Sequence, residues 1–248
     1  HSIINFSIND NNFQISNVND TIGLFSYLCN AKVKNIRMEA LNIHFDLSSH
    51  DYVPTSSVLI GGLAGTADAT VIENCSVSGS ITVKNCSYLD IGGLVGSLNK
   101  GSSYSSAEQC RSSCNITVIS NKDTPDAGKY LFCGGIIGDA ICNYLTDCFN
   151  SGNINIQTEG HGYVGGIIGS TSQKTSFTSC VNTGNIKSNI GCNGFVGGIS
   201  GRSTAGGLND TNSYIQCSNS GSIYAPKASY VGGIAGRYGG STGAPDLK

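Results

Sequence analysis

Hydrophobic and small residues follow one another in a short block that recurs six times along the chain. Each copy has an aliphatic residue, or Cys in one copy, then two glycines, a second aliphatic residue and a third glycine two positions later. The glycine pairs begin at residues 61, 92, 134, 165, 197 and 232, so the block returns every 31 to 42 residues. A period of this length is typical of solenoids, propellers and other repeat arrays.

A second block follows each of the first five glycine pairs. It carries a cysteine and, six positions later, an isoleucine; the cysteines are Cys75, Cys110, Cys148, Cys180 and Cys217. An even offset places both side chains on one face of a β-strand. The blocks keep their lengths while the spacers between them vary, so we expect strands in the blocks and loops in the spacers.

The glycine pairs predict bends. In a regular strand Val164 and Ile167, which flank one pair, would point to opposite faces, and both can face one core only if the chain turns between them. Glycine permits this because it adopts positive φ or lets backbones approach closely. Turn chemistry also recurs two residues after the cysteine, where Asn150, Asn182 and Asn219 precede Ser or Thr and then Gly. On successive coils these residues would form an Asn ladder.

Together the two blocks predict an all-β protein, a parallel β-helix of about six to seven coils. Residues 1–21 would supply an N-terminal half-coil, 22–57 a degenerate coil, 58–230 five clear repeats and 231–238 a last partial coil, so that 1–238 form one solenoid. The Gly/Ser-rich stretch 239–248 is expected to be a tail. One coil alone buries too little apolar surface to fold, so stacking must stabilise it.

Two other repeat architectures fit less well. Leucine-rich repeats need a helical return segment in each unit, and the Gly/Ser/Thr-rich spacers contain none. A propeller blade of four strands would suit the period, but its usual aromatic signature is missing.

With both blocks in view, the pattern aliphatic-Gly-Gly-aliphatic-x-Gly followed by Cys-x-Asn-x-Gly-x-Ile resembles the GLUG-type repeats of secreted and cell-surface proteins in bacteria and some protists. The resemblance covers about residues 3–236 and implies a right-handed parallel β-helix in an extracellular or cell-surface protein. Two positions depart from the pattern. Cys114 replaces the glycine of the second block, and Cys133 replaces the first aliphatic residue of the first block.

Composition narrows the classes of partner. Of the 248 residues, 34 are Gly and 12% are charged, about half the usual charged share. No segment approaches the roughly 18 apolar residues that a membrane span needs. A net charge of −2 without a basic stripe removes the attraction that dominates nucleic-acid binding. We therefore expect neither a membrane span nor a nucleic-acid partner.

The eleven cysteines allow three interpretations. We favour buried free thiols that act as small hydrophobic side chains. Disulfides between coils are the alternative, because equivalent Cα atoms in adjacent coils lie about 4.8 Å apart. A metal site is disfavoured, because no Cys-x-x-Cys pair occurs. Outside the repeating register, Cys133 and Cys142 are candidates for a loop disulfide.

Candidate catalytic chemistry is sparse. Parallel β-helices often carry polysaccharide lyases and hydrolases, whose carboxylates lie on adjacent coils, and Glu73 and Glu108 do share a register. Such charges more often lie solvated at strand edges, and no histidine has a recognisable nucleophile partner. We expect no catalytic residue, no metal and no cofactor, and keep a polysaccharide-binding or polysaccharide-cleaving enzyme as the alternative.

The expected function is therefore a non-enzymatic extracellular module, structural or adhesive in role. Its partners would be further copies of itself stacked end to end, neighbouring repeats of a longer chain, or glycans that contact its long loops. Candidate contact residues in those loops are Lys122, Asp123, Asp126, Tyr130, Arg202 and Tyr214. Sequons that permit N-glycosylation start at Asn5, Asn19, Asn74, Asn85, Asn115 and Asn209.

Overall fold

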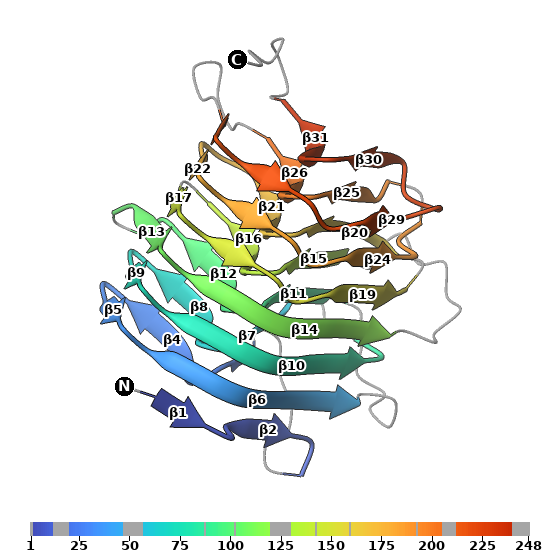
Figure 1. Cartoon of the computed structure of the whole chain (residues 1–248). Coiled ribbons are helices and arrows are strands. Elements are labelled where there is room, and N and C mark those ends of the chain that lie inside the picture. The colour runs from blue at the N-terminus through green and yellow to red at the C-terminus, as the bar shows by residue number, and fades with distance from the viewer. Residues whose placement is uncertain are drawn as a thin grey trace.

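The chain folds into a parallel β-solenoid of about six coils (Figure 1). The computed structural model describes residues 2–11, 20–46, 57–86, 88–101, 103–119, 130–141, 143–158, 160–191, 193–204 and 212–239. Each complete coil passes through four sheets, and inside the stack each strand pairs in parallel with the equivalent strands of the coils before and after it. The predicted fold class is thus confirmed. Within the described residues no helix is long and apolar enough to cross a membrane.

Sheet 1 holds the longest strands and contains the second sequence block. It has 11 strands: β1 (Ser2–Ile4), β2 (Ser7–Asn9), β6 (Arg37–Asp46), β10 (Ser76–Lys84), β14 (Arg111–Ile119), β18 (Phe149–Asn150), β19 (Ile154–Gln157), β23 (Val181–Asn182), β24 (Ile186–Ser188), β28 (Ser218–Asn219) and β29 (Ile223–Tyr224).

Sheets 2 and 3 flank the glycine pairs. Sheet 2 ends at the first glycine of each pair and comprises β3 (Thr21–Ile22), β7 (Val58–Gly61), β11 (Tyr88–Gly92), β15 (Tyr130–Gly134), β20 (His161–Gly165), β25 (Phe195–Gly197) and β30 (Tyr230–Gly232). Sheet 3 begins beyond the pair and comprises β4 (Phe25–Cys29), β8 (Ala64–Asp68), β12 (Val95–Asn99), β16 (Ile137–Ala140), β21 (Ile168–Thr171), β26 (Ser200–Ser203) and β31 (Ala235–Tyr238).

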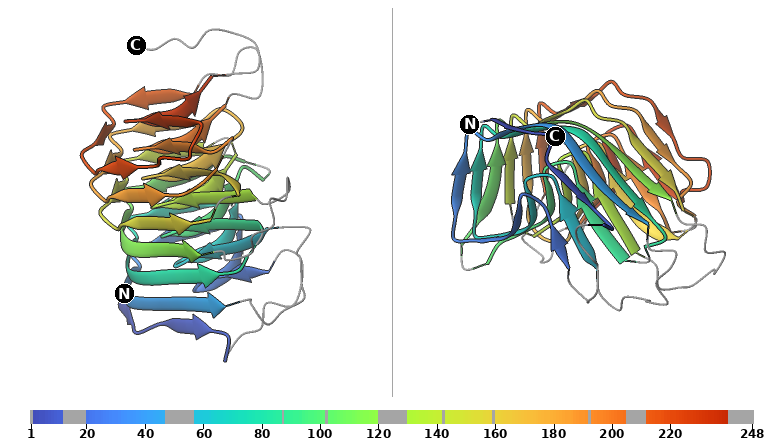
Figure 2. Two further views of the ribbon diagram at one scale, coloured as in Figure 1. Left: turned by 90° about the vertical axis from the view of Figure 1, so that its right-hand side faces the viewer. Right: turned by 90° about the horizontal axis from the view of Figure 1, so that it is seen from below.

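Sheet 4 is formed by short strands between sheet 3 and the next strand of sheet 1. They are β5 (Lys32–Lys34), β9 (Val71–Glu73), β13 (Ser105–Glu108), β17 (Asn143–Thr146), β22 (Ser176–Thr178) and β27 (Ser213–Ile215). Figure 2 shows the strands stacked in chain order along one axis and, in the view along that axis, the coils superposed around a common interior.

The glycine pair forms the corner between sheets 2 and 3, where the sequence predicted a bend. Val164 and Ile167 are both fully buried, so they do face the same core. Positive φ is not the reason for glycine here, because φ is not positive at any of these pairs. Close approach is the reason: a Cβ on the first glycine of each pair would collide with the carbonyl oxygen three residues ahead, as Gly165 would with Ile168.

The left-handed residue lies elsewhere, at the corner between sheets 4 and 1. The residue before each of the five repeat cysteines has a φ between 50° and 54°, and these residues are Asn74, Gln109, Asp147, Ser179 and Gln216. We expected the left-handed turn at the asparagines two residues after the cysteine, but it lies one residue before the cysteine. None of these five is glycine, and a left-handed conformation costs most other residues about 1–2 kcal/mol. Each of these coils nevertheless adopts the left-handed conformation, because the corner turns the next strand back over the core.

The second block is one strand in the early coils and two in the later ones. Between β6 and β10 the register shifts by one residue, because Met38 to Leu41 of β6 lies opposite Val77 to Gly79 of β10, and Gly79 has a φ of 136°. In the later coils the strand stops altogether, for example between β18 and β19. Cys75 and Ile81 both lie in the core, as expected, although the strand that joins them is not regular.

One hydrophobic core runs along the stack from Ile22 to Ile199. Aliphatic side chains of equivalent positions lie above one another, so each coil covers the apolar side chains of its neighbour. Cys133 belongs to this core, since it lies in register between Ile91 and Val164 and is fully buried. We expected a Cys133–Cys142 disulfide, but Cys133 is a free thiol that points into the core. Cys142 lies outside the described residues.

Candidate functional site

The five repeat cysteines form a column at the corner between sheets 4 and 1. The residues after them pair in one register, and the first four side chains are at most 1% exposed, while Cys217 is half-buried. Each buried thiol donates to a backbone carbonyl of the coil before it, as Cys148 Sγ does to Ala107 O at 3.3 Å. All five repeat cysteines are free thiols. Within the described residues no group of three or more His, Cys, Asp or Glu side chains could hold a metal ion.

The three turn asparagines form a ladder inside the solenoid. Asn150 Nδ2 donates to Asn182 Oδ1, and Asn182 Nδ2 donates to Asn219 Oδ1, both at 2.8 Å. Each amide also bonds to the backbone two residues ahead, where Asn150 accepts from the N–H of Gly152 at 3.1 Å and donates to its carbonyl at 2.9 Å. These bonds replace the sheet pairing that is lost where the strand breaks, which satisfies the buried backbone.

The Asn ladder also explains the second glycine of the pair. A Cβ on Gly135 would collide with the Asn150 amide, and a Cβ on Gly166 with the Asn182 amide. Each such Cβ would also meet the equivalent glycine carbonyl of the next coil. The two sequence blocks are therefore parts of one packing unit, since a side chain at the glycine would displace the ladder.

A second ladder, which sequence reasoning missed, lies on the exposed face of sheet 1. Asn115 Oδ1 accepts from the backbone N–H of Asn153 at 3.0 Å, and Asn153 Oδ1 accepts from that of Asn185 at 3.0 Å. Asn185 Oδ1 in turn accepts from the N–H and hydroxyl of Ser222 at 2.9 and 2.8 Å. The signal was present in the sequence: a polar residue, usually Asn, immediately before each block-ending isoleucine.

The sequons occupy different structural positions. Asn5, Asn74 and Asn85 have left-handed backbones, and Nδ2 of Asn74 and of Asn85 already donates, to Asn35 Oδ1 at 2.7 Å and to Asp46 Oδ1 at 2.9 Å. Asn115 belongs to the exposed ladder. Asn19 and Asn209 lie outside the described residues. Glycosylation of these sites stays a prediction.

The six predicted ligand-contact residues do not form one site. Lys122, Asp123 and Asp126 lie outside the described residues. Tyr130 begins β15 and is 41% exposed, while Arg202 in β26 donates to the Tyr163 hydroxyl at 3.4 Å. Tyr214 is not in a ligand loop: it belongs to β27, packs against the core, stacks on Phe177 at 4.8 Å and shares a hydrogen bond with Ser200. Its ring replaces an aliphatic core residue of sheet 4, which is why it points inward.

The outer surface of sheet 2 carries a column of aromatic rings. Phe132, Tyr163 and Phe195 lie in one register and stack with centroids 5.2 and 5.0 Å apart. In an earlier coil Asp90 occupies the same position of this column. Its burial and the nearby negative charge of Asp139 raise the pKa of the Asp90 carboxyl to about 8. Burial likewise raises the pKa of Asp139 to about 6. At neutral pH the Asp90 carboxyl is therefore mostly protonated, whereas that of Asp139 is mostly ionised.

Glu73 and Glu108, the carboxylates that shared a register in the sequence, are neighbours in sheet 4. Glu73 pairs with the ammonium group of Lys34, and this contact lowers the pKa of the Glu73 carboxyl. A carboxylate held ionised by a lysine is poorly suited to act as a general acid. The pair fits the solvated interpretation better than a catalytic one.

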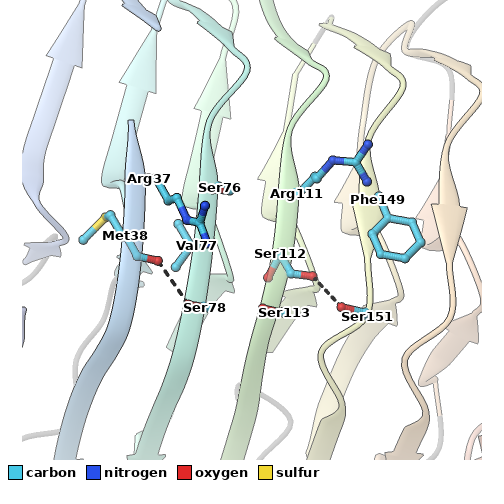
Figure 3. A pocket seen from close by; sticks show the side chains of 10 residues that line it. All are labelled: Arg37, Met38, Ser76, Val77, Ser78, Arg111, Ser112, Ser113, Phe149 and Ser151. Atoms are coloured by element: carbon cyan, nitrogen blue, oxygen red, sulfur yellow. Dashed lines mark hydrogen bonds between the residues drawn. The ribbon is translucent and has the colours of Figure 1, made fainter. Parts of the chain in front are cut away.

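A hollow of about 370 Å³ lies on the outer face of sheet 1 (Figure 3). Its strands are β6, β10, β14 and β18. One row across them reads Arg37, Ser76, Arg111 and Phe149, all in register. Further along the strands the lining is serine-rich, with Ser78, Ser112, Ser113 and Ser151.

The two arginines of the hollow are held differently. Arg37 Nε lies 2.6 Å from Glu39 Oε1, so part of its charge is neutralised. The Arg111 guanidinium lies 5.6 Å from the centre of the Phe149 ring, a cation–π distance. Among the described residues Arg111 has no ion-pair partner. Arg111 and Phe149 also line a second hollow of about 490 Å³, around the corner towards Asp147 and Ser179.

The arrangement is suited to binding rather than to one evident reaction. Guanidinium groups donate several hydrogen bonds in a fixed plane, and serine hydroxyls both donate and accept. Ser78 and Ser151 already donate to the carbonyls of Met38 and Ser112, at 3.3 and 3.5 Å, which leaves their oxygens as acceptors. A ligand that offers anionic groups and hydroxyl donors would meet both kinds of partner.

Comparison with known proteins bears on the repeat unit. No curated protein and no solved structure matches the chain. Residues 56–82 match the family model described as the GLUG motif. This segment contains β7, β8, β9 and most of β10, and therefore both sequence blocks of one repeat. The chain thus carries a GLUG motif at residues 56–82, and that motif forms one coil of its parallel β-solenoid.

Proposed function

We propose that the chain is a non-enzymatic extracellular module, structural or adhesive in role, that binds a polar polymer on the outer face of sheet 1. The observation that carries this proposal is the hollow that contains Arg37 and Arg111. Its lining comes from four successive strands, so the binding face runs along the stack and can extend from coil to coil. Rigid repeat surfaces of this kind suit extended ligands.

In the structural role, copies of the protein would associate end to end. At the last described coil, the outer edges of β27 to β31 have no partner strand within the described residues. Tyr224, Tyr230 and Val231 in this coil are each more than half exposed. An open strand edge with apolar side chains is a template for further strand pairing. Another coil, from a second copy or from further repeats, would cover it.

The enzymatic alternative also has a specific observation in its favour. Asp90 and Asp139 interact across sheets 2 and 3, and their raised pKa values suit a proton donor. Asp90 is 7% exposed, however, which leaves little room for a sugar ring to reach it. Release of reducing ends from a polysaccharide would favour this alternative over the binding role.

One set of measurements tests these roles. The purified protein is incubated with immobilised neutral and acidic polysaccharides, and bound protein and released reducing ends are quantified in parallel. Binding without cleavage is the expected result. Electron microscopy over a concentration series then separates the two roles, because ordered filaments with an axial repeat indicate a structural polymer. Cleavage of any polysaccharide, or the absence of both binding and assembly, would overturn the proposal. Antibody labelling of intact expressing cells tests the location.

A further inference from the structure

The hollow on sheet 1 places two guanidinium groups on alternate coils. Arg37 in β6 and Arg111 in β14 both pair in register with Ser76, which lies between them in β10. Adjacent strands lie about 4.8 Å apart, so the two arginine Cα atoms are separated by about 10 Å along the stack. Figure 3 shows both side chains on the same face of the sheet.

The charges at this site are open to a ligand. Arg37 and Glu39 are both at the surface, and the contact with Glu39 is made through Nε. Arg111 is exposed, and its planar group is steadied by Phe149 rather than by a carboxylate. An arginine without an acidic partner keeps its full capacity for bidentate bonds to carboxylate or sulfate oxygens.

Ser76 lies between the two arginines in the same row, and further hydroxyl groups lie beside them. Ser76, Ser78 and Ser113 line the hollow, and Ser78 already donates to a backbone carbonyl. Its oxygen is therefore available to accept a hydrogen bond. A ligand that carries anionic groups at intervals, together with hydroxyl groups, would match both the two arginines and the serines beside them.

We propose that the hollow binds an acidic polysaccharide, one bearing carboxylate or sulfate groups, with successive acidic groups on Arg37 and Arg111. The chain of the ligand crosses β6, β10 and β14 and runs along the stack. This inference rests on the proposed adhesive function and names the class of its ligand. Arg111 carries most of the specificity for charge, and Arg37 carries less because Glu39 competes for it.

Other anionic polymers fit this surface less well. Nucleic acid binding depends on neutralising many closely spaced phosphates, whereas the protein has a net charge of −2 and the hollow supplies two cations beside Glu39. An extended peptide would add to a free strand edge, but β10 is already paired on both sides by β6 and β14.

Binding measurements on matched variants test the inference. The probes are polygalacturonate and dextran sulfate, with their neutral counterparts, methyl-esterified polygalacturonan and dextran. The variants are Arg111→Gln, Arg37→Gln and Lys187→Gln. Lys187 lies on β24, exposed on the same sheet but two coils beyond β14 and outside the hollow, so Lys187→Gln removes the same charge from another part of that sheet. Far-ultraviolet circular dichroism and thermal melting confirm that each variant folds.

We expect the wild type to prefer acidic over neutral polymers. Arg111→Gln should weaken this binding about tenfold, the loss expected for a charge-assisted hydrogen bond. Arg37→Gln should weaken it less, and Lys187→Gln should have little effect. Equal loss from Arg111→Gln and Lys187→Gln would overturn the inference, because it would show general charge attraction. Tighter binding of polyglutamate or an oligonucleotide would also overturn it.

The outcomes separate this inference from the proposed function. Binding of neutral and acidic polysaccharides with equal affinity would refute the acidic ligand and leave the adhesive role intact. Cleavage of either polymer would refute the non-enzymatic role itself. A preference for carboxylated over sulfated polymer, or the reverse, would identify the acidic group.

Discussion

Gly166→Ala is the most direct test of the packing between the two sequence blocks. Gly166 is the second glycine of its pair and lies against the Asn182 amide and the carbonyl of Gly198 in the next coil. A methyl group at this position would overlap both. The backbone has little freedom to retreat, because the Gly166 N–H donates to Gly197 O at 3.2 Å. Relief must therefore come from displacement of the amide.

The cost follows from these contacts. Overpacking a well-filled interior destabilises a protein by about 1–3 kcal/mol. Displacing Asn182 would also break its donations to Asn219 Oδ1 at 2.8 Å and to Gly184 O at 2.9 Å, and each lost hydrogen bond contributes about 1 kcal/mol. We expect Gly166→Ala to lower the free energy of unfolding by about 3–5 kcal/mol in total.

The chain supplies a matched control. Gly233 occupies the same position in the last coil, and a Cβ there would meet no atom within 4 Å. Gly233→Ala should therefore be neutral, or stabilise by up to about 1 kcal/mol because alanine restricts the unfolded chain. Guanidinium titrations followed by circular dichroism measure both variants. If the two variants unfolded at the same denaturant concentration, the proposed contact between glycine and the Asn ladder would be wrong.

Three further predictions concern buried polar groups. Asn182→Ala should cost about 3–5 kcal/mol, because it leaves buried partners unsatisfied, whereas Asn185→Ala in the exposed ladder should cost about 1 kcal/mol; denaturant titration compares them. Because folded Asp90, with a pKa of about 8, keeps a proton that the unfolded chain has lost, the wild type should lose about 1 kcal/mol of stability per unit between pH 6 and 8. Asp90→Asn should remove this slope, and an unchanged slope would contradict the burial argument. Iodoacetamide should label exposed Cys29 in the native protein and buried Cys148 only after unfolding without reductant; a Cys148 that stays unlabelled would indicate a disulfide.

Much of the architecture could be predicted from periodicity. The spacing of the glycine pairs set the coil length, and the burial of both residues beside each pair followed from the geometry of strands. The cysteine column followed as well, because equivalent positions of a stacked repeat must lie above one another. These features are local or periodic, so a one-dimensional pattern contains them.

The candidate site could not be predicted in the same way. Arg37 and Arg111 are separated in the sequence by another repeat, and their equivalents in other coils are Ser76, Phe149 and Val181, so no motif marks them. Loop length drew attention to Tyr214, which the structure places against the core. A repeat sequence shows which positions stack. Residues that differ in one or two coils can be recognised as a site only when their neighbours in adjacent coils are known.

The sequence by itself determined the repeat, the parallel stacking and the columns of equivalent side chains, because each depends on spacing along the chain. Tertiary structure alone decided why the second glycine is required, since the Asn182 amide and the next coil occupy the space of its Cβ. It also decided that the left-handed corner precedes each cysteine and that Asp90 is buried beside Asp139. These outcomes depend on distances between coils, which arise only when the coils are stacked.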